Sequence, residues 1–270
     1  PRDVYTYKNG FKHGTYTGKN YYGNTTAKGT FIQGFQDGEW NYYYDNGTLE
    51  STRNYDIDKL EGVYVRYHEN GKERIKTVYQ EGEINGVYES FYENGQLKSK
   101  EFEVMGKNHG KKENFGEEGN LQLIRYYNSG RLTGYSYLDK AGAEVAVIPV
   151  KNGTAKVKAY YNNGKVSREF EYVNGELAGN YNTYHYNGKL QYETLYKDGK
   201  LDGADVSYYQ DGTKKELRTY ANDQLHGKLQ KFYPSCTLKE EIIYVYDYRH
   251  GISNYYDEQG KLIKKETYRN

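Results

Sequence analysis

The sequence is poor in sulfur, tryptophan and proline: among its 270 residues are one cysteine, one methionine, one tryptophan and three prolines. With Cys236 as the single cysteine, no disulfide can form within the chain. Charge of one sign is also lacking, because 38 Lys and Arg residues stand against 37 Asp and Glu residues. A net charge of +1 provides no field that would gather nucleic acid or an anionic membrane surface.

Long apolar stretches are missing as well. No run approaches the roughly 20 apolar residues that span a membrane as a helix, so no membrane span is predicted. The sequence begins with Pro1 instead of methionine, which predicts a processed or trimmed N-terminus.

Tyrosine and glycine dominate what is present, with 36 and 31 residues respectively. A tyrosine buries its ring but needs water or a hydrogen-bond partner for its hydroxyl. A chain whose apolar material is mostly tyrosine is therefore predicted to be thin, with most rings near the surface, instead of a globule with a dry centre.

The sequence repeats itself every 24 residues, and this period determines the predicted architecture. One glycine marks each unit, and we call these residues the anchor glycines. They are Gly14, Gly38, Gly62, Gly86, Gly110, Gly134, Gly179, Gly203, Gly227 and Gly251. Between Gly134 and Gly179 the frame slips, and Ala155 takes the anchor position after a unit of only 21 residues.

Two turn signals accompany each anchor. The first lies about nine residues after it and is usually Asn-Gly or Asp-Gly, as at Asn70-Gly71 and Asp211-Gly212. The second lies four residues before the anchor and is usually glycine, with Asp58, Asp223 and Asp247 as substitutes. These residue types tolerate the positive φ of tight turns. Each unit therefore reads as two short strands joined by a hairpin turn.

Strand residues recur in columns as well. Aromatic residues stand five positions after the anchors, leucine or valine mostly eleven after, and aromatic residues mostly seventeen after. Because a lone hairpin is marginal in water, each must stack on the next. The predicted fold is all-β: an elongated, twisted antiparallel ribbon of about ten to eleven stacked hairpins. We expect an N-terminal set of repeats over 1–133, an irregular shortened repeat over 134–154, and a C-terminal set over 155–270.

The unit that begins Gly86-Val-Tyr-Glu-Ser-Phe-Tyr-Glu-Asn-Gly-Gln-Leu, with its counterparts from Gly62 and Gly203, resembles the bacterial variant of the MORN repeat. That variant reads G-x-x-x-x-Y-Y-x-N-G-x-L, and the resemblance covers nearly the whole chain except 134–154. It implies β-hairpin ribbons that serve protein association or scaffolding. Many bacterial members resemble antitoxin or immunity proteins and some are exported, so the resemblance favours an exported or cell-surface location. It supplies no catalytic residue.

Neither the histidines nor the cysteine is placed for metal binding or catalysis. Four of its six histidines precede anchor glycines, where neighbouring copies would lie about 9.6 Å apart, too far to share one zinc ion. Cys236 replaces a turn glycine, which indicates sequence drift instead of a reactive thiolate. We predict no enzyme activity, no metal and no cofactor. The aromatic residues lack the basic groove that single-stranded nucleic acid needs, so no nucleic-acid partner is predicted.

The candidate partner-binding residues are tyrosines six positions after the anchors, which we call the tyrosine column. Tyrosine offers a large, rigid contact area with a polar tip. The column also accepts His68, His185 and Asp257, so it is predicted to be exposed, whereas the preceding aromatic column is predicted to be packed. The alternative is that these rings form ladders that merely hold the sheet together. Its members are Tyr44, Tyr92, Tyr161, Tyr209 and Tyr233.

The irregular repeat carries the longest apolar run, residues 143–150. Pro149 cannot donate a ladder hydrogen bond, so it belongs at an edge, bulge or break. One interpretation is a packed bend between the two sets of repeats. The other is an exposed apolar spot around Val147 and Ile148 that docks a partner or a second copy of the chain.

Taken together, these patterns predict a non-catalytic protein-binding repeat module. Its forms include an antitoxin- or immunity-like protein that occludes a toxin and a surface-associated scaffold. The alternative is a carbohydrate- or cell-wall-binding hairpin repeat protein, although such modules are usually richer in tryptophan, and Trp40 is the single one here.

Overall fold

The computed structural model describes residues 3–268, and within this range the ordered elements are all β-strands. The strands pair with antiparallel neighbours, hairpin after hairpin, which confirms the predicted all-β hairpin-repeat fold. The chain divides into two compact units, 1–120 with 124–131 and 121–123 with 132–270, called unit 1 and unit 2 below.

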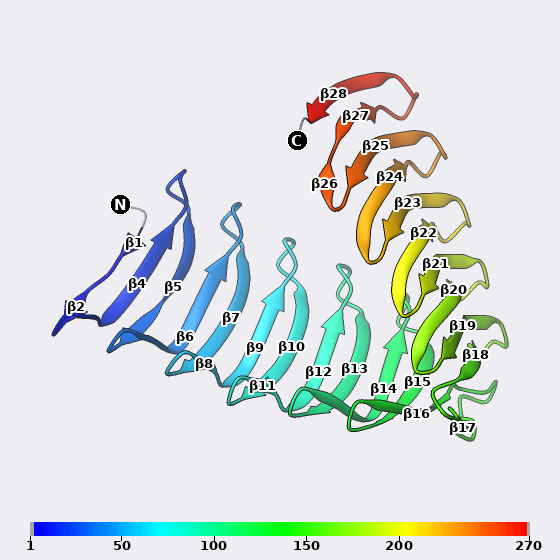
Figure 1. The fold of residues 1–270 in the computed structure, drawn as a ribbon, viewed down its shortest axis with the longest axis horizontal. Coiled ribbons are helices and arrows are strands. Elements are labelled where there is room, and N and C mark those ends of the chain that lie inside the picture. The colour runs from blue at the N-terminus through cyan, green and yellow to red at the C-terminus, as the bar shows by residue number, and fades with distance from the viewer. Residues whose placement is uncertain (1–2, 269–270) are drawn as a thin grey trace. The chain divides into compact units, whose positions relative to one another are not determined.

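Unit 1 is a row of hairpins in which each pair of strands lies beside the next pair along the chain (Figure 1). The order of its main strands is β1-β4-β5-β6-β7-β9-β10-β12-β13-β14, with β8 on β7 and β11 on β10. The strands are β1 (Asp3–Val4), β2 (Tyr7–Lys8), β3 (Phe11–Lys12), β4 (Gly14–Lys19), β5 (Thr25–Ile32), β6 (Phe35–Tyr43), β7 (Leu49–Asp56), β8 (Lys59–Leu60), β9 (Gly62–Tyr67), β10 (Glu73–Gln80), β11 (Glu83–Ile84), β12 (Gly86–Phe91), β13 (Leu97–Val104) and β14 (Lys107–Phe115).

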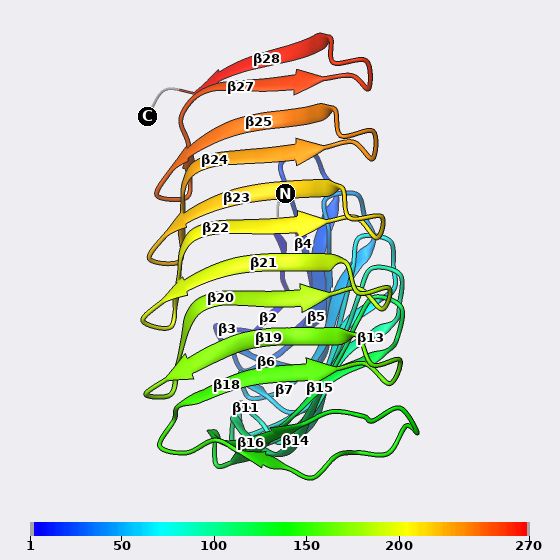
Figure 2. The same ribbon diagram turned by 90° about the vertical axis from the view of Figure 1, so that its right-hand side faces the viewer.

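Unit 2 continues the same design, and its hairpins are stacked in sequence order from β18 to β28 (Figure 2). Its strands are β16 (Arg131–Ser136), β17 (Ile148–Pro149), β18 (Ala155–Tyr160), β19 (Val166–Val173), β20 (Glu176–Tyr184), β21 (Leu190–Lys197), β22 (Lys200–Tyr208), β23 (Lys214–Ala221), β24 (Gln224–Phe232), β25 (Leu238–Val245), β26 (Tyr248–Arg249), β27 (Gly251–Tyr256) and β28 (Leu262–Tyr268). The residues of β15 (Leu121–Asn128) are shared between the two units, and Arg131 at the start of β16 belongs to unit 1.

Both predicted turn types form, and their hydrogen bonds repeat from unit to unit. In the Asn-Gly turn after β9, the backbone N–H of Gly71 donates to the His68 carbonyl at 2.9 Å. The turn between β10 and β11 has two consecutive positive φ angles, 53° at Glu81 and 88° at Gly82, as a type I′ hairpin requires. Asp58 holds the equivalent place with a φ of 63°, so aspartate does substitute for glycine there.

The two faces of the strands differ in burial. Side chains two and four residues after an anchor, and thirteen, fifteen and seventeen after it, share one face, which we call the closed face. It holds many of the most buried side chains of the hairpins, including Trp40, Thr77 and Ile242 at 1–2% exposure. We call the other side the open face. The core of unit 2 lies near β15, β16, β18 and β19 and consists of Leu123, Tyr135, Val157, Ala159 and Phe170.

The irregular repeat contains little regular structure. Only β17 forms within residues 137–154, and it pairs with β16 through Gly134 opposite Pro149 and Tyr135 opposite Ile148. Gly134 lacks the positive φ of the regular anchors. A Cβ added to it would meet Val147 Cγ1 at 2.6 Å and the Ile148 carbonyl oxygen at 3.0 Å, so glycine is needed here for close approach.

Candidate binding surfaces

The tyrosine column ties each hairpin unit to the next. Each of its five hydroxyls donates a hydrogen bond to a backbone carbonyl 23 residues further along the chain, at the end of the first strand of the next unit. The distances are 2.7 Å for Tyr44 to Tyr67, 2.8 Å for Tyr92 to Phe115, 2.5 Å for Tyr161 to Tyr184, 2.9 Å for Tyr209 to Phe232 and 2.9 Å for Tyr233 to Tyr256. The tyrosine hydroxyls, which were expected to contact a partner, thus donate hydrogen bonds to carbonyls of the same chain.

The rings of the column are partly covered too. Lysine ammonium groups lie 5.4–5.8 Å from the ring centroids of Tyr92, Tyr209 and Tyr233. Tyr161 is only 2% exposed, and the other four tyrosines are half-buried. The column is therefore less exposed than the sequence suggested, and the preceding aromatic column is half-buried as well. Partner binding by these five tyrosines stays a prediction.

Histidines can enter the tyrosine column because they reproduce its hydrogen bond. His68 Nε2 lies 3.0 Å from the Phe91 carbonyl oxygen, and His185 Nε2 lies 3.2 Å from that of Tyr208. Both acceptors are 23 residues ahead, as for the tyrosines. Polar residues at these positions suggest exposure in the sequence, but in the structure both histidines preserve the hydrogen bond between neighbouring repeats.

The two apolar candidates of the irregular repeat lie in different surroundings. Val147 is 49% exposed, whereas Ile148 packs against the core of unit 2. Consecutive residues in extended backbone point to opposite sides, which explains the difference. Docking through Val147 therefore stays a prediction, and Ile148 contributes to packing.

An aromatic cluster lies on the closed face of unit 1, over strands β4 to β7 and β9. Its centre is Trp40, whose ring centroid lies 5.2 Å from that of Tyr16, 5.0 Å from Phe31 and 6.1 Å from Tyr42. The indole Nε1 donates to the Thr30 carbonyl at 3.1 Å, which satisfies its single polar group. We call the following set the aromatic face: Tyr16, Phe31, Trp40, Tyr42, Arg53, Tyr55 and Tyr64.

Arg53 extends this cluster from β7 toward β9. Its guanidinium carbon lies 4.2 Å from the ring centroid of Tyr42 and 5.8 Å from that of Tyr64. Burial disfavours the charged guanidinium and so acts to lower the pKa of Arg53. The hydrogen bond and the electrostatic interaction with the Tyr55 hydroxyl outweigh burial, so the pKa of Arg53 is raised. Burial, followed by the Tyr55 hydrogen bond, raises the pKa of Tyr42 to about 12. At neutral pH the Tyr42 phenol is thus neutral and the Arg53 guanidinium beside it is positively charged.

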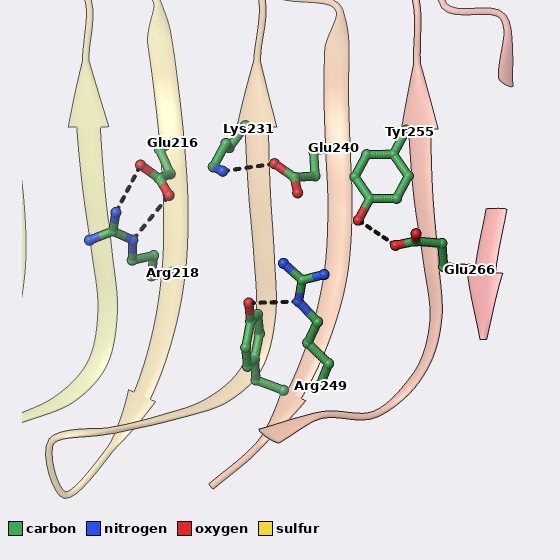
Figure 3. Close-up of polar contacts among 8 residues, drawn as sticks. Glu216, Arg218, Lys231, Glu240, Arg249, Tyr255 and Glu266 are labelled. Atoms are coloured by element: carbon green, nitrogen blue, oxygen red, sulfur yellow. Dashed lines mark hydrogen bonds and ion pairs between the residues drawn. The ribbon is translucent and has the colours of Figure 1, made fainter. Parts of the chain in front are cut away.

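The closed face of unit 2 is different, because its last hairpins carry paired charges instead of stacked rings (Figure 3). Glu216 accepts two hydrogen bonds from Arg218, at 3.0 and 3.1 Å. Lys231 pairs with Glu240 at 2.8 Å on the neighbouring strand. Pairing leaves this surface polar and close to neutral.

A second polar group lies on β27 and β28. Glu266 accepts hydrogen bonds from Tyr255 at 2.9 Å and Tyr268 at 2.8 Å, and it pairs with Lys264 at 2.7 Å. These contacts, led by Lys264, lower the pKa of Glu266 to about 2. Burial and the bond to Glu266 raise the pKa of Tyr255 to about 12. The Tyr244 and Tyr268 hydroxyls accept from Arg249 and raise its pKa.

Six segments of the chain match one known family, the MORN repeat variant. The matched residues are 36–56, 60–81, 84–102, 154–174, 177–198 and 249–270. The six matched segments are similar to the MORN repeat variant and together make up 127 of the 270 residues. Segments outside the matches keep the same strand and turn geometry, as β22 to β25 show. No curated protein matches the chain.

MORN repeats are generally protein- or lipid-binding modules, and the family is typically non-catalytic. Within residues 3–268 no group of three or more His, Cys, Asp or Glu side chains is placed to hold a metal ion. No helix in the described part of the chain is long and apolar enough to cross a membrane.

Two shallow hollows lie on the surface of the hairpins, and both are lined mostly by polar residues. One has a volume of about 320 Å³ and is lined by Asn24, Thr25, Lys28, Tyr43, Asn46 and Gly47. The other has about 110 Å³ and is lined by Tyr192, Asp205, Ser207, Lys215, Glu216 and Arg218. Small-molecule sites usually enclose about 300–1,000 Å³ and are lined mostly by hydrophobic and aromatic side chains, so the polar lining of both hollows and the small size of the second do not fit one.

A buried polar network that sequence analysis missed surrounds Gln122 in unit 2. Arg168 donates to Gln122 Oε1 through Nε at 3.0 Å and Nη2 at 2.7 Å. Gln122 Nε2 donates to the Tyr161 hydroxyl at 2.8 Å and to Gln191 Oε1 at 3.2 Å. The network joins β15 to β19 and β21, although up to 69 residues separate its members. No local pattern marks such a contact, and its burial indicates a structural role.

Proposed function

We propose that this MORN-repeat chain is a non-catalytic protein-binding module that engages its partner through the aromatic face of unit 1. The observation that supports the proposal is the continuous surface of rings around Trp40 with the Arg53 guanidinium between two of them. Tryptophan, tyrosine and arginine are the residues in which interface binding energy concentrates.

The rigidity of this surface favours binding further. Trp40 is 1% exposed and forms a floor, while Tyr42 and Tyr55 are half-buried with ring centroids 6.1 and 6.4 Å from that of Trp40. Packed rings lose little further side-chain freedom when a partner covers them, so less of the binding energy is spent on ordering. A partner that supplies apolar groups for the rings and a carboxylate for Arg53 would fit this face.

An antitoxin- or immunity-like protein that occludes a toxin is one form of this proposal, and a scaffold at the cell surface is another. A sugar-binding module fits less well. Its stacking residue would be the single tryptophan, and that ring is covered by neighbouring aromatic side chains.

The experiment compares capture of partner proteins from a lysate of the source cells by the wild-type chain and by two variants. In the test variant, Arg53→Ala and Tyr64→Ala remove a charged and an aromatic member of the face. In the control, Tyr22→Ala removes a ring that is 83% exposed and lies outside the aromatic face. A melting curve for each chain separates loss of binding from loss of folding.

The proposal predicts a specific captured protein whose affinity falls at least about tenfold in the folded test variant and is unchanged in the control. Equal capture by both variants would contradict the assignment of the face. Binding to lipid vesicles with no captured protein would replace the protein-binding proposal with a lipid-binding one.

A further inference from the structure

Beyond the aromatic face, the closed face of unit 1 changes from stacked rings to rings beside a carboxylate. Tyr79 on β10, Tyr88 on β12 and Glu103 on β13 belong to this face by their spacing from the anchors, and we call them the ring–carboxylate cluster. Burial raises the pKa of both phenols, and the charge of Glu103 adds to both rises, so its carboxylate lies near both rings. Tyr79 joins the cluster to the aromatic face, because its ring centroid lies 5.7 Å from that of Tyr64.

The anchor Gly86 adds no side chain between Tyr79 and Glu103. Glu103 lies opposite Gly86, and β12 is the strand between β10 and β13. The backbones at Tyr79 and Glu103 are therefore two strand spacings apart, about 9.6 Å. An ammonium or guanidinium group fits between a ring and a carboxylate at this separation, because it contacts an oxygen at about 3 Å and a ring centroid within about 6 Å.

The charge of Glu103 has no direct counterion in the described part of the chain. On the same strand, Glu101 pairs with Lys112 at 2.6 Å, whereas Glu103 forms no ion pair there. Burial, followed by the charge of Glu101, raises the pKa of Glu103 despite the attraction of Lys112. A carboxylate in such surroundings is stabilised when a positive group approaches it.

Two buried oxygens beside the cluster also lack hydrogen-bond partners. Thr77 on β10 is 2% exposed and belongs to the closed face, and Asn108 on β14 lies opposite Glu103. Within residues 3–268, neither Thr77 Oγ1 nor Asn108 Oδ1 has a hydrogen-bond partner. Leaving a buried acceptor unbonded is costly, so this part of the face favours a donor from outside the chain.

We propose that the ring–carboxylate cluster binds a lysine or arginine side chain of the partner protein. The inference rests on the proposed function, because the same partner covers the aromatic face. A cation beside Tyr79 and Tyr88 is attracted by the ring faces and by the Glu103 carboxylate together. Its N–H groups are the donors that this part of the face lacks.

The spacing of the charges on the closed face describes the partner further. Arg53 on β7 and Glu103 on β13 are separated by four strand spacings, about 19 Å. An extended segment covers that distance in about six residues. The partner segment therefore carries an acidic residue for Arg53 and a basic residue for Glu103 about six residues apart, with apolar residues between them.

Selection of random phage-displayed peptides on the immobilised full chain supplies the probe. The peptides have about twelve residues, twice the length that the segment needs. Those that lose binding to the folded variant with Arg53→Ala and Tyr64→Ala occupy the aromatic face and are kept. Fluorescence anisotropy then gives the affinity of the tightest kept peptide for the wild type, for Glu103→Gln and for Glu93→Gln. The last is the matched control, an exposed carboxylate in the turn after β12 of the same repeat unit.

The kept peptides should be enriched in Lys or Arg about six residues from Asp or Glu. Glutamine in place of the basic residue of the peptide, or in place of Glu103, should weaken binding at least about tenfold. Both changes together should weaken it little more than either alone, because they remove the same contact. Glu93→Gln should leave the affinity unchanged. The melting temperature of Glu103→Gln should not fall, because burial and Glu101 disfavour the charge that it removes.

Kept peptides without a basic residue, or two glutamine substitutions whose effects simply add, would overturn the inference and leave the proposed function standing. If no selected peptide depends on Arg53 and Tyr64, the proposed function fails and the inference fails with it. Binding to phosphatidylcholine vesicles that Glu103→Gln abolishes would assign the cluster to a lipid headgroup instead.

Discussion

Removing hydroxyls from the tyrosine column should measure how strongly one hairpin unit is tied to the next. The variant carries Tyr209→Phe and Tyr233→Phe, which delete two bonds of 2.9 Å to the Phe232 and Tyr256 carbonyls and leave both rings in place. A hydrogen bond of this kind contributes about 1 kcal/mol net. The two losses should nearly add, since no side-chain partner is shared, giving about 2 kcal/mol.

Urea unfolding followed by circular dichroism gives the readout. With a slope of about 2 kcal/mol per molar, the midpoint for unit 2 should fall by about 1 M. Tyr22→Phe is the matched control, because that residue is 83% exposed and outside the column. An unchanged midpoint in the double variant, or an equal shift in the control, would show that the inter-repeat bonds do not stabilise the fold.

Three further predictions concern single positions. Glu266 has a pKa of about 2 in the fold and about 4.5 when unfolded, so its contribution is present above pH 4.5 and lost as the pH falls through 2. The stability difference between wild type and Glu266→Gln, measured by urea unfolding, should disappear over that window. Cys236 has a φ of 66° where most repeats have glycine, so Cys236→Gly should raise stability by about 1 kcal/mol in the same assay. Ile148→Asp should lower the melting temperature by several degrees, because it places a charge against the unit 2 core, while the exposed Val147→Asp should change it much less. Equal effects of the last two changes would contradict the packing of Ile148.

The hairpin fold was predictable because its signals are local. A turn such as that at Glu81-Gly82 needs two positive φ angles. Asn, Asp and Gly adopt positive φ most readily, so these residues indicate such turns in the sequence. The 24-residue period then gives the order of the strands, because every hairpin can pair only with its neighbours.

The binding surfaces were less predictable, because their determinants connect residues far apart in sequence. The aromatic class of Tyr44 is visible in the sequence, but its acceptor is a carbonyl 23 residues away, and only the stagger of neighbouring hairpins brings the two together. A histidine at position 68 suggests that the column is exposed, because histidine is a polar residue. In the structure, however, His68 forms the same hydrogen bond to the next repeat that the tyrosines form. Gln122 gave no signal at all, since its partners come from two distant strands.

The bond from each column tyrosine to a carbonyl 23 residues ahead has a consequence for how such a chain can change length. If residues 62–85 were deleted, Tyr44 would face the carbonyl of Phe91 in place of that of Tyr67, because the two are 24 residues apart and end equivalent strands. Loss or duplication of one whole unit therefore restores the same bond across the new junction. An insertion of a single residue into one of these strands would instead shift the hydroxyl relative to its acceptor. Recombination between copies of the 24-residue segment is thus the tolerated route by which this sheet can be lengthened or shortened.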